Sequence, residues 1–141
     1  MKNFVRILSL ALVAVMLAVT LVSCGAPAKT AADAEAALKE NGYTPINDDR
    51  IVPGVLALSG IASCTNKVTG VKFVEDEDGN KKTEYVAIYY FADKDSATKA
   101  MEKIGDEEKK DKDEKAEDWV SATQSGAMIY YGTKAAIKAA K

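Results

Sequence analysis

The chain opens with an almost uninterrupted apolar run, whereas the rest alternates short apolar and polar stretches. From Ile7 to Val22 only Ser9 and Thr20 interrupt the apolar residues, and Lys2 and Arg6 make the preceding segment positive. A helix that crosses a hydrocarbon core of about 30 Å needs about 20 residues. The run is shorter than that and has the length of a signal-peptide core, so it predicts a targeting segment rather than a permanent membrane span.

Three later segments have the composition and spacing of helices. They are Ala31 to Glu40, Lys94 to Ile104 and Lys134 to Lys141. Each follows a residue type that caps helix N-termini, namely Thr30, Asp93 and Thr133. Asn41-Gly42 is a suitable stop for the first helix because glycine adopts the left-handed conformation easily.

Strand-like patterns occupy the other apolar stretches. The clearest are a segment around Val71 and Phe73, Tyr85 to Phe91, Trp119 to Thr123, and Ala127 to Tyr131. The acidic stretch after the first contains Asp-Gly, which predicts a hairpin turn. Tyr85 to Phe91 is apolar on both alternating faces, which predicts a central strand. Tyr43 to Ile46 is a candidate short strand, confined to an edge by Pro45.

These elements predict the order α-β-β-α-β-β-α. A weak internal repeat supports it, since Ile88-Tyr89-Tyr90 and Ile129-Tyr130-Tyr131 each precede an alanine-rich helix. We therefore predict a small α+β domain with an antiparallel sheet of about four strands and helices mainly on one face, distantly similar to ferredoxin-like sheets. Residues 47–60 are ambiguous, with Pro53 to Leu58 a candidate short helix.

Composition narrows the chemistry. The chain has 141 residues, which favours one domain, and no histidine, which excludes histidine-based triads and histidine-ligated zinc. Its formal charge of −2 argues against a nucleic-acid partner. It contains no phosphate-binding glycine loop and no dinucleotide fingerprint. We therefore expect no catalytic centre, no metal and no bound cofactor.

The apolar run ends in Leu21-Val22-Ser23-Cys24, and this segment resembles that of a bacterial lipoprotein precursor. Leu21, Val22 and Ser23 are similar to the lipobox that signal peptidase II recognises, and Cys24 is similar to the lipid-accepting cysteine. The resemblance implies a diacylglyceryl lipid on the Cys24 thiol and cleavage after Ser23. An uncleaved anchor, or an ordinary signal peptide in which Cys24 is incidental, are the alternatives.

The resemblance also implies an organisation and a location. Residues 1–23 are the signal peptide, 24–29 a lipidated short tether, and 30–141 a single small α+β domain. The domain is expected on the extracytoplasmic side of a bacterial membrane, in the cell envelope, held by two acyl chains because one binds only marginally. Loss of Lys2 and Arg6 changes the net charge to −4. Cys64 then has no disulfide partner within the chain and is expected to be buried.

Tyrosine is the most suggestive residue type for binding. Five of the six tyrosines lie in two predicted strands: Tyr85, Tyr89, Tyr90, Tyr130 and Tyr131. Strand alternation places neighbours on opposite faces. If helices cover one face, some of these rings form an exposed interaction surface for a protein, peptide or glycan. The alternative is that they fill a thin core.

Two acidic segments have simpler interpretations. Asp76, Asp78 and Asn80 alternate like calcium ligands. An EF-hand loop that began at Asp76 would need its glycine at the sixth position and a glutamate at the twelfth, but Gly79 is fourth and Ala87 is twelfth. This segment is expected to be a solvated hairpin tip. Residues 106–118 form either a loop or an extension of the preceding helix, and they serve either as a solvated face or as a docking patch for a basic partner.

These observations predict a membrane-anchored, noncatalytic binding or interaction module for a protein, peptide or envelope polymer. One alternative is an accessory or structural subunit of an envelope complex. Another is an envelope enzyme based on carboxylates.

Overall fold

The computed structural model describes residues 25–141 except 59, 62, 113–115 and 117. The signal peptide, the lipobox residues Leu21, Val22 and Ser23, and the lipid-accepting Cys24 therefore lie outside the described residues. The elements in chain order are α2 (Ala31–Glu40), β1 (Thr44–Asp48), α3 (Ile51–Leu58), β2 (Cys64–Glu75), β3 (Lys81–Phe91), α4 (Lys94–Asp111), β4 (Trp119–Ser125), β5 (Met128–Thr133) and α5 (Lys134–Ala139).

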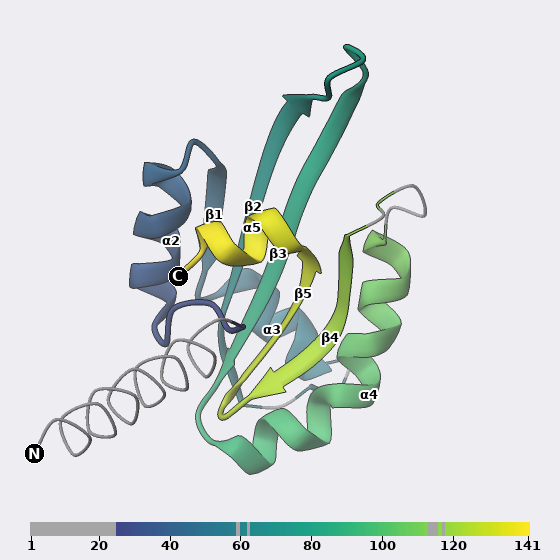
Figure 1. The fold of residues 1–141 in the computed structure, drawn as a ribbon. Helices are drawn as coiled ribbons and strands as arrows, with labels where there is room; N and C mark the ends of the chain where they lie inside the picture. The colour runs from purple at the N-terminus through teal and green to yellow at the C-terminus, as the bar shows by residue number, and fades with distance from the viewer. Residues whose placement is uncertain (1–24, 59, 62, 113–115, 117) are drawn as a thin grey trace, which may run out of the picture.

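The five strands form one antiparallel sheet in the order β1-β2-β3-β5-β4 (Figure 1). The predicted α+β class with an antiparallel sheet is confirmed, and β3 is the central strand as predicted. The sheet has one strand more than the four predicted most clearly. This additional strand is β1, which contains Pro45 and lies at an edge. Proline is tolerated there because an edge strand does not need every N–H for pairing.

The helices cover both faces of the sheet, so the prediction that they lie mainly on one face is wrong. Helices α2 and α5 pack with Val86, Ile88 and Tyr90 of β3. Helices α3 and α4 pack with the alternating residues of the same strand, among them Ala87 and Tyr89. A strand that is apolar on both faces needs cover on both, because exposing either would leave apolar surface in water.

Side-chain capping explains where α2 and α4 begin. The Asp33 N–H donates to Thr30 Oγ1 at 3.2 Å, and the Ser96 N–H donates to Asp93 Oδ1 at 2.7 Å. Both caps were predicted. Thr133 precedes α5 without a side-chain cap bond; instead its hydroxyl accepts from the Tyr85 N–H at 3.3 Å. Tertiary contact has replaced the local one.

Helix α4 extends beyond the predicted end at Ile104, into the charged run. Two ion pairs spaced by three residues support the extension, Lys109 with Asp106 at 2.8 Å and Lys110 with Glu107 at 2.6 Å. Such exposed pairs contribute only a few tenths of a kcal/mol each. The extension therefore also depends on buried contacts of the last turns, which are described below.

Candidate functional site

The candidate tyrosines are mostly core residues. Tyr89 and Tyr131 are 0% exposed, Tyr90 and Tyr130 are 7% and 6% exposed, and Tyr85 is half-buried. The prediction that some of these rings face outward is wrong, because helices cover both faces of the sheet. The alternative interpretation, that the tyrosines fill a thin core, describes the structure.

Four of the aromatic residues form one cluster beneath α4. The Tyr85 ring is stacked on Trp119 with centroids 6.3 Å apart, and Tyr131 lies 6.1 Å from both Tyr89 and Trp119. Asp111 at the end of α4 accepts hydrogen bonds from Tyr131 Oη at 2.6 Å and from Tyr85 Oη at 3.0 Å. Burial raises the pKa of both phenols, so they remain protonated donors to this carboxylate.

Glu108 is a buried acid that sequence reasoning placed on a solvated segment. It is 8% exposed, and its two oxygens accept from Trp119 Nε1 and from the Ala122 N–H, each at 2.9 Å. The carboxylate therefore joins α4 to β4. Helical spacing could have identified it, because Glu108 continues the buried stripe of Ala100 and Ile104.

The predicted tether is packed on the domain. The Ala28 N–H donates to the Ala140 carbonyl at 2.8 Å, the Tyr90 hydroxyl donates to the Ala28 carbonyl at 2.8 Å, and Pro27 is buried. The segment from Ala26 to Lys29 is thereby held against the body of the domain.

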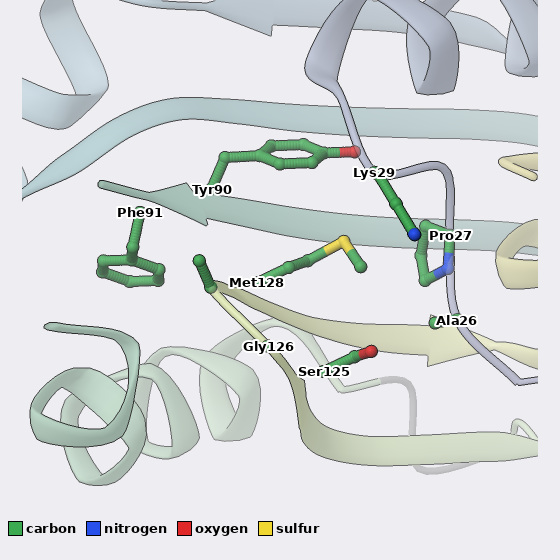
Figure 2. A pocket seen from close by; sticks show the side chains of 9 residues that line it. Ala26, Pro27, Lys29, Tyr90, Phe91, Ser125, Gly126 and Met128 are labelled. Atoms are coloured by element: carbon green, nitrogen blue, oxygen red, sulfur yellow. The ribbon is translucent and has the colours of Figure 1, made fainter. Parts of the chain in front are cut away.

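A hollow of about 550 Å³ lies beside this segment. Figure 2 shows Tyr90 and Met128 of the sheet next to Pro27 and Lys29 of the N-terminal segment. Its lining is largely apolar and comprises Ala26, Pro27, Lys29, Tyr90, Phe91, Ser125, Gly126, Ala127 and Met128.

A second hollow, of about 420 Å³, adjoins Gly25 and is basic. Three lysines are among its lining residues, namely Lys134 and Lys138 of α5 and Lys141 beyond it. The remaining lining is Gly25, Val120, Tyr130 and Ile137. Neither of the two hollows has an aspartate or glutamate in its lining.

An uncovered apolar strip was missed by sequence reasoning. Ile46 of β1 is 63% exposed and Phe73 of β2 is 77% exposed. The register pairs Ile46 with Thr69 and Thr44 with Val71, so these side chains and Phe73 share one sheet face. We call Ile46, Thr69, Val71 and Phe73 the apolar strip. Figure 1 shows the long β2–β3 hairpin reaching past the helices, and Phe73, which pairs with Thr83, belongs to its outer part.

The acidic hairpin tip is a self-contained turn. Asp76 Oδ1 accepts from the N–H groups of Asp78 and Asn80 at 3.0 and 2.8 Å. The hydrogen bond from the Asn80 N–H holds the pKa of Asp76 below its usual value. These bonds close the turn, and the described part of the chain has no group of three or more acidic or cysteine side chains arranged to hold a metal.

Cys64 is expected to react slowly with alkylating reagents at neutral pH. Burial raises the pKa of its thiol to about 11, and its Sγ donates to the Asn66 carbonyl at 3.5 Å. The thiolate is the nucleophile, so iodoacetamide labelling measured by mass spectrometry should be slow at pH 8 and accelerate above about pH 10. Protein unfolded in urea is the control, and equally fast labelling of the folded protein at pH 8 would contradict the prediction.

The raised pKa of the Cys64 thiol also makes the stability of the fold depend on pH. The thiol stays protonated longer in the folded state than in the unfolded one, so its contribution to stability is complete below the unfolded pKa of about 8.5. That contribution falls as pH rises towards the folded value of about 11.

No described helix is both long enough and apolar enough to cross a membrane. Comparisons of the chain with protein-family models, with curated proteins and with solved structures gave no match.

Proposed function

We propose that this protein is a lipid-anchored extracytoplasmic lipoprotein of a bacterial envelope, whose domain is a noncatalytic module that binds a protein or peptide. The lipobox resemblance supports the anchor, and the docked segment of residues 25–29 is compatible with attachment close to the membrane. The observation that carries the binding role is the exposure of Ile46 and Phe73 on one sheet face.

The composition of the apolar strip favours a polypeptide partner. Exposed Ile46 and Phe73 share this sheet face with half-buried Thr69 and Val71. Together they offer aliphatic, aromatic and hydroxyl groups. Full burial of one large apolar side chain contributes about 1.5–3 kcal/mol. Phe is enriched at protein interfaces, whereas a sugar would need a denser set of hydrogen-bonding groups than this strip offers.

The partner is expected to pack on the face rather than extend the sheet. Strand β1 is an edge and could in principle pair with an added strand. Pro45 removes one backbone donor from this five-residue strand. Side-chain burial on the face therefore offers more stabilisation than backbone pairing at the edge.

The described carboxylates of α4 do not favour the enzyme alternative. Glu108 is bonded to Trp119 and to the Ala122 backbone, and Asp111 accepts from two tyrosines. All these contacts join α4 to the sheet, which is a structural role.

Cys24→Ala is expected to abolish lipid attachment. The acyl chains supply the membrane affinity, about 0.8 kcal/mol for each buried methylene, so the protein should also lose its tight membrane association. Metabolic labelling with a radioactive or clickable fatty acid measures this directly. Ser121→Ala, at an exposed position of β4, serves as the surface control and should label normally. Persistent labelling of the Cys24→Ala protein would refute the anchor.

A photocrosslinking residue at position 73 is expected to capture a discrete partner in intact cells. The same residue at position 58 is the matched control, because Leu58 is 91% exposed and lies on α3 outside the apolar strip. Adding Ile46→Ser should weaken capture from position 73 by about tenfold, equivalent to about 1.4 kcal/mol. Equal capture from both positions, or no effect of Ile46→Ser, would rule out the apolar strip as the binding surface.

A further inference from the structure

The lysines of the basic hollow lie beside the position where the chain would enter the membrane. Lys134 and Lys138 line this hollow together with Gly25, which is one residue from Cys24. Both lysine side chains belong to exposed residues. An anchor at residue 24 would therefore bring these ammonium groups to the level of the lipid headgroups.

Position in the fold keeps these lysines apart from much of the acidic run. Helix α5 packs on one face of the sheet, whereas α4, with Asp106 and Glu107, packs on the other. Charges more than about 8–10 Å apart are largely screened at physiological salt. Asp118 is the nearer acid, since its backbone carbonyl accepts from the Lys134 N–H at 3.1 Å. The surface next to Gly25 is therefore basic, while α2 on the same face carries Asp33, Glu35 and Glu40, and α4 on the other face has five lysines against six acids.

We propose that the α5 face, through Lys134 and Lys138, binds the anionic headgroups of the bilayer and sets the orientation of the domain. The inference rests on the proposed lipid anchor. Two acyl chains alone hold the protein in the membrane but leave it free to tilt. Lysines near an anionic surface add a directional attraction, which turns the α5 face towards the bilayer.

This orientation would also leave the apolar strip accessible. Ile46 and Phe73 lie on the sheet face that packs against α3 and α4, the face opposite α5. With α5 against the bilayer, that face points away from the lipid. The anchor, the basic side and the proposed binding surface then form one consistent arrangement.

Lysine footprinting tests the proposal on the lipidated protein reconstituted in vesicles. An amine-acetylating reagent is applied in vesicles containing phosphatidylglycerol and in vesicles of phosphatidylcholine alone. Contact with the bilayer shields an amine from the reagent, and an anionic surface favours its protonated, unreactive form. Lys134 and Lys138 should therefore react about fivefold more slowly in the anionic vesicles. Lys81 and Lys82, exposed on the β2–β3 hairpin, should react equally in both. High salt should remove the difference.

Charge reversal provides the matched variants. Lys29, an exposed lysine five residues after Cys24, should also react more slowly in anionic than in neutral vesicles when the domain is oriented by α5. In Lys134→Glu/Lys138→Glu protein this protection of Lys29 should be lost. Lys81→Glu/Lys82→Glu protein should keep it. Equal reactivity of Lys134 and Lys138 in the two vesicle types, with lipid present on Cys24, would overturn the orienting role alone. Absence of lipid on Cys24 in the intact-mass measurement would overturn the anchor and this inference together.

Discussion

Replacing Gly132 with alanine is expected to destabilise the fold by more than about 3 kcal/mol, the range of severe backbone strain and overpacking combined. Gly132 has φ +139°, a conformation that side chains disfavour, and a Cβ there would lie 2.1 Å from the Tyr85 carbonyl oxygen. The obstacle is the backbone of the central strand, to which Gly132 is paired through Val86. Relief would require the two strands to separate.

Urea unfolding followed by circular dichroism measures this effect. Gly105→Ala is the matched control because Gly105 lies within α4, and nothing stands within 4 Å of its would-be Cβ. Alanine at an open helical position should stabilise the protein by about 0.5–1 kcal/mol. The two glycine substitutions should therefore shift the urea midpoint in opposite directions. A Gly132→Ala midpoint equal to that of the native chain would show that the β3–β5 approach is not as close as described.

Replacing Glu108 with alanine is expected to cost about 2–4 kcal/mol, because hydrogen bonds to a charged group contribute about 1.5–3 kcal/mol each and two donors lose their acceptor. Trp119 Nε1 and the Ala122 N–H both point at this carboxylate. Glu108→Gln should lose less, since its amide oxygen can retain one of the two bonds. We therefore expect the free energy of unfolding to decrease in the order native protein, Glu108→Gln, Glu108→Ala.

Trp119 reports the change directly, as the one tryptophan of the chain. Loss of the Glu108 contact should shift its fluorescence emission to longer wavelength before global unfolding, since its indole N–H turns to water. Glu102→Ala, at an exposed position of the same helix, is the control and should change stability by less than about 0.5 kcal/mol. If both substitutions have the same small effect, Glu108 does not join α4 to β4.

The positions of the main elements could be predicted because their signals are local. Thr30 and Asp93 cap helices through their own side chains, and Asn41-Gly42 ends the first helix. The continuous apolar run in β3 indicated its central place, since burial on both faces leaves no position for polar residues. The end of α4 could not be predicted from charge alone, because Glu108 is accommodated there by donors from β4, 11 and 14 residues further along the chain.

The candidate site depended on contacts that no local pattern contains. Strand alternation correctly separates Tyr89 from Tyr90, but whether either ring meets water depends on which helices cover each face. Phe73 has the same alternating pattern as a buried strand residue, yet it is exposed because the β2–β3 hairpin is longer than the helices beside it.

The sequence by itself determined the exclusion of histidine chemistry, the α+β class and the caps of α2 and α4, because these follow from composition or from residues close together in the chain. Only the tertiary structure decided that helices cover both faces, that the tyrosines are core and Ile46 and Phe73 are surface, and that Lys134 and Lys138 line the same hollow as Gly25. These outcomes depend on which distant segments pack together, and burial and local charge density are properties of that packing.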